Sequence, residues 1–235
     1  MFPIRDDNPV HRPAPVTIVL LIAIVAIYLA QIAIVRSGDL AWTRRMYDAA
    51  FIPDAFWQAP LRYASSLVTY AFLHADPIHL TGNAFFLFVF GDNVEARMGS
   101  GRFAVFYLAA AAAAAALQGA VEPNGWQPMI GASGAISAVL GVYMLWYPRR
   151  PVQALIVPLV GPWLLLRPFG RIPRFFLVWF PAWLYIGYWA VVQFVEAGGS
   201  LVATTEGAGV AWWAHVGGFL FGIAAAPLLR PSRRP

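Results

Sequence analysis

Cysteine is absent from this sequence, which excludes disulfide bonds, iron–sulfur clusters and zinc sites with thiolate ligands. Lysine is absent too, and all 16 basic residues are arginine. Charged residues make up only 11% of the 235 positions, less than half of the roughly 25% that is usual in soluble domains. Because 60% of the residues are hydrophobic, much of the surface cannot face water. We therefore expect an integral membrane protein.

Apolar runs long enough to cross a bilayer, about 20 residues each, recur along the chain. They predict an all-α polytopic membrane protein, a single domain over residues 1–235 with six transmembrane helices at about 16–35, 78–95, 103–121, 133–147, 175–195 and 211–229. The first run exceeds the apolar core of a signal peptide, about 7–15 residues, so we expect it to be retained. Prolines and a glycine interrupt residues 152–166, which we expect to dip into the membrane or lie along its interface. A seventh span is the alternative.

Arginine clusters set the expected orientation, since basic residues gather in cytoplasmic loops. The segment between the fourth and fifth spans holds five arginines and no acidic residue, and the tail adds Arg230, Arg233 and Arg234. Six spans with both termini in the cytoplasm satisfy this pattern, whereas a seventh would place the tail outside. The arginines flank apolar segments and form no single patch, so nucleic-acid binding is not expected despite the net charge of +5.

Two connecting segments carry their own signals. Residues 36–66 are rich in aromatic side chains, which favours an interfacial element packed against the bundle, although an ordinary aromatic belt explains the composition equally well. The segment GDNVEARMGSGR, residues 91–102, is expected to be a structural polar hinge on the cytoplasmic side. In it Glu95, Arg97 and Arg102 can pair, while Gly99 and Gly101 end helices.

The stretch GASG, residues 131–134, places Ser133 between glycines where the fourth span begins. Backbone N–H groups are unpaired at a helix start and can stabilise an anion, so this serine can be a nucleophile whose own N–H binds the oxyanion. Serine and glycine are also common where membrane helices touch, because they let backbones approach. For this stretch alone, packing is the stronger explanation.

His215 lies one turn into the last span and needs a polar partner in an apolar surrounding. It shares one helical face with Gly218 and Gly222, which form a groove for another helix. The fourth span offers a matching face of small residues, Ser133, Ser137 and Gly141. If the two faces meet, His215 comes beside Ser133, as a general base must beside a hydroxyl nucleophile. A histidine bonded to a neighbouring helix for packing alone is the alternative.

His79 and Asn83, four residues apart near the outer end of the second span, share a helix face. Both can donate hydrogen bonds, as an oxyanion hole requires. His74 precedes Pro77, outside the helix, where a structural role is expected. A zinc site of these histidines with Asn83 is the alternative, but no H-E-x-x-H pattern or suitably placed acidic base supports it, so no metal is expected.

With these residues identified, the chain resembles the rhomboid family of intramembrane serine proteases. The resemblance rests on LHADPIHLTGN, VEARMGSG, GASG and AHVGG, which occur in the family's order between residues 73 and 218. It implies a rhomboid-type six-helix bundle and an endopeptidase without a cofactor that cleaves transmembrane segments of other membrane proteins. Ser133 would be the nucleophile and His215 its base. His79, Asn83 and the Ser133 N–H would stabilise the oxyanion.

One position departs from the family. Four residues after the serine, many rhomboids carry an aromatic ring that stacks beneath the histidine, whereas this chain has Ser137. His215 must then be held by another group, a neighbouring aromatic ring or the Ser137 hydroxyl.

Further expectations follow from the topology and the resemblance. The glycine-rich loop 196–209 lies over the active-site opening as a mobile cap, and substrate passes sideways between the second and fifth spans. The site opens to the outer side of a bacterial inner membrane, and the protein is a monomer. Two other functions stay open: an inactive rhomboid-like protein that binds membrane helices, and a small transporter in which the polar residues line a path.

Overall fold

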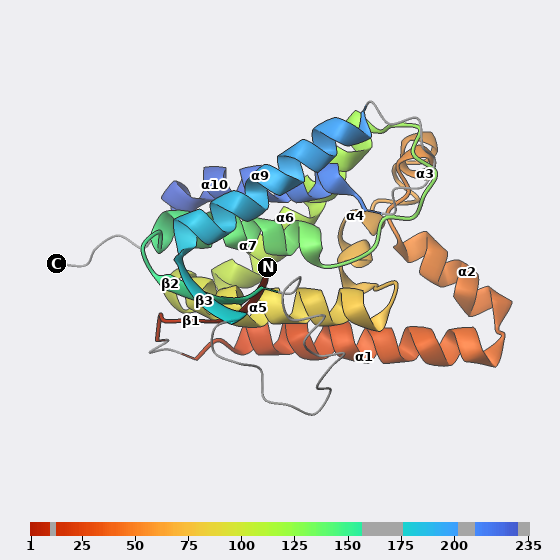
Figure 1. Ribbon diagram of the computed structural model, residues 1–235. Coiled ribbons are helices and arrows are strands. Elements are labelled where there is room, and N and C mark those ends of the chain that lie inside the picture. Colours follow the sequence, from red (N-terminus) through yellow and green to blue (C-terminus); the bar gives the residue numbers. More distant parts are fainter. Residues whose placement is uncertain (10–12, 157–175, 202–209, 230–235) are drawn as a thin grey trace.

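The computed structural model describes residues 1–9, 13–156, 176–201 and 210–229, which form a helical bundle (Figure 1). Its long helices are α1 (Pro15–Ser37), α5 (Pro77–Met98), α6 (Ser100–Val121), α7 (Ser133–Trp146), α9 (Ala182–Ser200) and α10 (Trp212–Leu229). Short helical segments connect α1 to α5, namely α2 (Leu40–Ala49), α3 (Pro53–Gln58), α4 (Ser66–Thr69) and the 3₁₀ turn η1 (Tyr70–Phe72). The strands are β1 (Phe2–Asp6), β2 (Pro151–Leu155) and β3 (Leu177–Pro181).

Within the described residues, α1, α6 and α10 are long and apolar enough to cross a membrane. Helix α7 is apolar but has only 14 residues. Helices α5 and α9 have 22 and 19 residues but contain polar side chains, Asp92, Glu95 and Arg97 in α5 and Gln193 and Glu196 in α9. Each predicted span overlaps one of these helices, while the count of six membrane crossings stays a prediction.

The predicted start of the fifth span, at residue 175, is wrong. Leu177–Pro181 form strand β3, and helix α9 begins at Ala182 and continues to Ser200. The residues Leu-Val-Trp-Phe are of the β-branched, aromatic and bulky kinds that fit a pleated sheet. At the helix start, the N–H of Ala182 donates to the Arg150 carbonyl (2.9 Å) and that of Trp183 to the Pro148 carbonyl (2.9 Å). These bonds join α9 to the chain that leaves α7.

The all-α prediction also omits a three-stranded antiparallel sheet, in which β2 pairs with both β1 and β3. Of the segment expected at the membrane interface, residues 152–155 therefore lie in a strand, and residues 157–166 lie outside the described residues. The Asp6 carboxylate at the end of β1 accepts hydrogen bonds from Tyr143 of α7 and from Asn93 of α5. Burial raises the pKa of Asp6 to about 6. Through Asp6 the sheet is thus hydrogen-bonded to the C-terminal parts of both α5 and α7.

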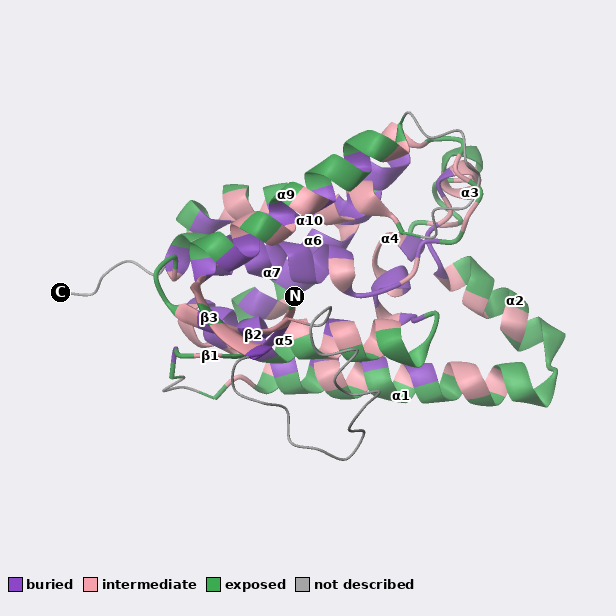
Figure 2. Ribbon diagram, in the orientation of Figure 1, coloured by how far each residue is buried: buried purple, intermediate pink, exposed green. Residues whose placement is uncertain are grey.

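The first loop packs against the bundle over part of its length. Trp57 of α3 donates its indole N–H to the Gly119 carbonyl of α6 (2.8 Å), and α4 also packs on α6. Helix α2 has no buried residue and extends away from the bundle (Figures 1 and 2). For residues 36–66 the predicted packing is confirmed for α3 and wrong for α2, and the interfacial position of the loop stays a prediction.

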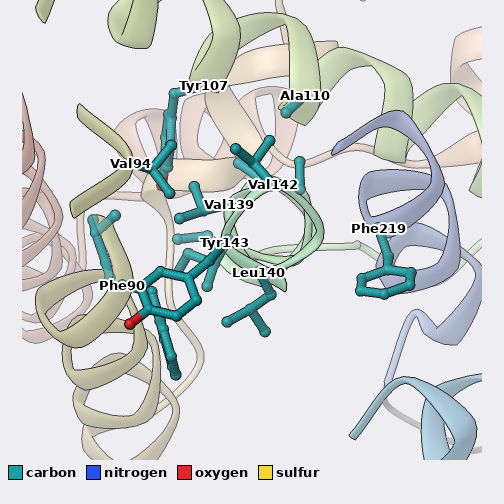
Figure 3. Packing of buried hydrophobic residues seen from close by; sticks show 14 of the residues in the cluster. Phe90, Val94, Tyr107, Ala110, Val139, Leu140, Val142, Tyr143 and Phe219 are labelled. Atoms are coloured by element: carbon teal, nitrogen blue, oxygen red, sulfur yellow. The ribbon is translucent and has the colours of Figure 1, made fainter. Parts of the chain in front are cut away.

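Helix α7 lies at the centre of the core. Val139, Val142 and Tyr143 project from it toward residues of α5 and α6, such as Phe90 and Tyr107 (Figure 3). Each of the three is 0% exposed. In contrast, much of the outer side of α1 is exposed (Figure 2), including Ile22, which is 63% exposed. A helix that presents large apolar side chains outward suits a lipid surrounding.

The polar hinge after α5 differs from its prediction. The carboxylate of Glu95, fully buried, accepts hydrogen bonds from the backbone N–H of Val16 (2.9 Å) and of Thr17 (2.6 Å) and from the Thr17 hydroxyl (2.8 Å). Glu95 therefore caps the start of α1, which has no side-chain cap of its own. Arg97 instead donates to the Trp146 carbonyl (3.3 Å). Gly99 separates α5 from α6, but Gly101 lies inside α6.

We predict that Glu95→Ala lowers the free energy of unfolding by about 2–4 kcal/mol, because it leaves buried N–H groups at the start of α1 without an acceptor. Equilibrium unfolding in detergent micelles measures the change. Asp48→Ala is the matched control, since Asp48 is an exposed acidic residue of α2. That variant should stay within about 0.5 kcal/mol of the original protein. Equal stabilities of the two variants would contradict the capping role.

Candidate active site

Three helix starts meet at one cavity of about 590 Å³. Its lining includes Ser133 at the start of α7, His215 in the first turn of α10, and His79 and Asn83 in the first two turns of α5. Trp189 of α9 completes one wall. The structure therefore brings together in one cavity all four residues that the sequence singled out.

Each glycine around Ser133 has a definite neighbour. Gly131 has a φ of +119°, and a Cβ there would lie 2.6 Å from the His79 ring and 3.4 Å from Asn83 Nδ2. At Gly134 a Cβ would lie 2.8 Å from both the Tyr70 hydroxyl and the Ala114 methyl group. Only glycine fits the left-handed conformation and the close approach at 131. These contacts bring the chain before α7 against the first turns of α5.

Helices α7 and α10 touch through their backbones. A Cβ at Gly218 would collide with the Gly134 carbonyl, and one at Gly222 with the Ala138 carbonyl. On the α7 side, a Cβ at Gly141 would lie 2.7 Å from the Phe219 carbonyl. The predicted meeting of the two small-residue faces is confirmed. Because the backbones approach so closely, side chains at the starts of the two helices come within hydrogen-bonding distance.

His215 lies between two hydrogen-bond partners. Its Nε2 is 2.7 Å from Ser133 Oγ, and its Nδ1 is 2.6 Å from Gln193 Oε1. The Ser137 hydroxyl, one of the expected supports, instead donates to the Ser133 carbonyl (2.6 Å). The other expected support, an aromatic neighbour, is present as Trp189 and Trp212, whose ring centroids lie 6.2 and 5.9 Å from that of the imidazole.

Gln193 is the site residue that the sequence analysis missed. It is 7% exposed and lies in α9, within the apolar run predicted as the fifth span. A polar amide within such a run was the available signal, by the same reasoning that singled out His215. Nothing in the local pattern, however, shows that α9 turns this side toward α10.

Asn83 presents an unpaired donor. Its side chain is 7% exposed, and its Nδ2 is buried with no hydrogen-bond partner within the described part of the chain. Leaving a buried donor without a partner costs about 1–3 kcal/mol. Asn83 lines the same cavity as Ser133, and its Nδ2 lies beside Gly131. The arrangement can therefore donate a hydrogen bond to an oxygen bound in the cavity.

His79 is placed by the start of α5. The Asp76 carboxylate accepts hydrogen bonds from the backbone N–H groups of Ile78 and His79 (2.8 Å each), which fixes the first turn. These bonds, that of His79 foremost, hold the pKa of Asp76 below its ordinary value. The capped turn places the His79 ring directly against Gly131, and both residues line the cavity.

His74 lies outside α5, as predicted, and is 2% exposed. Its ring packs edge-on against that of His79, with centroids 5.3 Å apart. Burial, together with the neighbouring His79, lowers the pKa of His74 to about 4. His74 is therefore neutral at neutral pH and supports the His79 ring by packing. Across the described ranges of the chain, no three His, Cys, Asp or Glu residues are grouped so that they could hold a metal ion.

One comparison with known proteins bears on this site. A family model described as the Rhomboid domain matches residues 61–232. The matched range includes the cavity residues of α5, α7, α9 and α10 and covers well over half of the chain.

We predict that Gly218→Ala lowers the free energy of unfolding by about 1–3 kcal/mol, because its methyl group would fall on the Gly134 carbonyl and push α10 from α7. Chemical denaturation in micelles measures the loss. The matched control is Gly187→Ala in α9, where a Cβ meets nothing within 4 Å. If both substitutions had the same effect, the glycine contact would not be what holds these helices together.

We also predict a pH dependence of stability from His74. The unfolded chain binds a proton at this residue below about pH 6.5, whereas the folded chain binds it only below about pH 4. Above about pH 6.5 His74 is neutral in both states and does not lower the free energy of unfolding. As the pH drops from 6.5 toward 4, the unfolded chain binds the proton first, so the free energy of unfolding falls. His74→Phe, which keeps a ring but cannot titrate, should unfold with a weaker pH dependence in this window. Parallel stability curves for the two proteins would contradict the prediction.

Proposed function

This chain belongs to the rhomboid family of membrane proteins, and from that premise we propose that it is an intramembrane serine endopeptidase. One observation carries the proposal: His215 Nε2 lies 2.7 Å from Ser133 Oγ, within reach of its proton. Rhomboid-family membership alone does not decide activity, since a family member without a working dyad can still bind membrane helices. The serine–histidine contact favours chemistry over binding.

The proposed reaction begins when Ser133 Oγ attacks the carbonyl carbon of the scissile peptide bond while His215 Nε2 takes the hydroxyl proton. The resulting oxyanion is stabilised by the Ser133 N–H, the Asn83 amide and His79. The same proton then passes from His215 to the leaving amine, and the C–N bond breaks. Water, with His215 again as base, hydrolyses the acyl-enzyme and restores the Ser133 hydroxyl.

The proposed substrates are transmembrane segments of other membrane proteins. A helix keeps its carbonyls in internal hydrogen bonds, so the substrate must unwind before Ser133 can reach one. Segments with glycine or other weak helix formers are favoured, because they cost less to unwind. Passage between α5 and α9 would bring such a segment to the cavity. Of the proposed cap, residues 196–209, residues 196–200 belong to helix α9 and not to a loop, and residues 202–209 lie outside the described residues.

We further propose that both termini face the cytoplasm of a bacterial cell, and that the cavity opens to the outer side of the inner membrane. The arrangement of the bundle supports this orientation. The sheet lies at the opposite end of the bundle from α3 and α4 (Figure 1), so we place the sheet on the cytoplasmic side and the cavity opening on the outer side. Arg149 and Arg150 lie between α7 and β2, at the sheet end, where cytoplasmic loops carry arginine. A monomer suffices, because one chain supplies every proposed site residue.

We predict that a fluorophosphonate probe labels the detergent-purified protein and that Ser133→Ala and His215→Ala abolish the labelling. Cleavage of a transmembrane substrate should fall by at least about 10³-fold in both variants, since neither half of a nucleophile–base pair works alone. Ser37→Ala is the matched control, because Ser37 is an exposed serine at the end of α1. Its labelling should equal that of the original protein.

The opposite result has a clear meaning. A folded, unlabelled wild-type protein would exclude an activated serine. Binding of membrane helices without cleavage would then become the leading function, and solute flux in proteoliposomes would test the transport alternative.

A further inference from the structure

The base in this dyad faces a requirement that Ser133 and His215 alone do not meet. Nε2 can accept the Ser133 proton only if the other ring nitrogen carries the hydrogen and the ring keeps its orientation. In this chain Ser137 occupies the position of the family's stacking aromatic ring, and its hydroxyl donates to the Ser133 carbonyl. Another group must therefore select the tautomer of His215.

Gln193 has the position and chemistry for this task. Its Oε1 lies 2.6 Å from His215 Nδ1, on the far side of the ring from Ser133. An amide oxygen accepts and never donates, so the hydrogen of this contact belongs to Nδ1. The Nε2 lone pair then faces the Ser133 hydroxyl. At 7% exposure Gln193 is shielded from water that could compete for the bond.

The ring is also held from the sides. Trp189, one helical turn before Gln193 on the same face of α9, and Trp212 flank the imidazole at centroid distances of 6.2 and 5.9 Å. The two indoles limit how the ring can tilt, but neither can choose which nitrogen carries the hydrogen. That choice falls to the amide.

We propose that Gln193 is the positioning residue of the dyad, holding His215 in its Nδ1–H tautomer with Nε2 directed at Ser133. The proposal rests on the proposed protease function. When Nε2 takes the serine proton, Nδ1–H of the imidazolium keeps its bond to Gln193, and the bond strengthens because the donor is now charged. No proton moves to Gln193. Helix α9 therefore supplies part of the catalytic machinery as well as one wall of the cavity.

The test compares two substitutions at position 193. Gln193→Met keeps the length of the side chain and removes the acceptor, whereas Gln193→Glu keeps an acceptor oxygen. We expect Gln193→Met to lower kcat and the fluorophosphonate labelling rate by about 10–100-fold, with KM changed less than about threefold. Gln193→Glu should restore both rates to within about tenfold of wild type. The small probe needs no passage between helices, so its rate reports serine activation separately from substrate access.

A matched control is Gln58→Met, the same change at an exposed glutamine of α3, which should leave labelling and cleavage at wild-type rates. A second measurement needs no variant at 193. The wild-type protein is labelled with ¹⁵N-histidine, and the His215 signals are assigned by their loss in His215→Ala. The ¹⁵N spectrum should show that Nδ1 of His215 carries the hydrogen and that Nε2 is unprotonated.

The outcomes separate the two proposals. An unlabelled wild type would count against the protease function itself. A labelled wild type with Nε2 protonated would overturn the role of Gln193, as would Gln193→Met labelled at the wild-type rate. So would Gln193→Glu as slow as Gln193→Met, since packing and not the acceptor would then matter.

Discussion

The backbone contact between α7 and α10 determines where the site residues lie. Helices in lipid gain little from burying apolar surface against each other, so close packing of small residues must hold them together. Gly218 and Gly222 leave no side chain between α10 and the carbonyls of Gly134 and Ala138. Ser133 and His215 lie in the first turns of these two helices, at one end of this contact. The distance of 2.7 Å between His215 Nε2 and Ser133 Oγ depends on this close approach of the two backbones.

Three polar side chains, Glu95, Asp6 and Asn83, differ in how far their hydrogen bonds are satisfied. At the sheet end, the buried Glu95 carboxylate has three donors, and Asp6 has Tyr143 and Asn93. At the cavity end, Asn83 Nδ2 lacks a partner within the described chain. Satisfied polar groups stabilise the fold, whereas an unsatisfied buried donor weakens it unless something binds. Because Asn83 lines the cavity, its unpaired Nδ2 can donate to a group that binds there.

Sequence reasoning worked where the signal was local. Ser133, His215 and Asn83 stand out because they are polar residues or neighbours of glycine within apolar runs. It missed contacts that join distant segments: Glu95 caps α1 by accepting from Val16, 79 residues earlier, and Gln193 reaches His215 from another helix. Strand β3 was missed for a similar reason. A short apolar run that continues into a helix looks like part of that helix, unless the partner strand is known.

The proposed chemistry depends on the groups around the cavity being neutral or already paired. In an apolar surrounding a fixed counter-ion would bind the donors that an oxyanion needs. Asp76 is the acidic residue among the described cavity lining, and its carboxylate is occupied by the backbone at the start of α5. A glutamine oxygen at His215 orients the base without adding a buried charge, which would cost several kcal/mol unless paired. The donors of Asn83 and of the Ser133 backbone are then left for the negative charge that forms during the reaction.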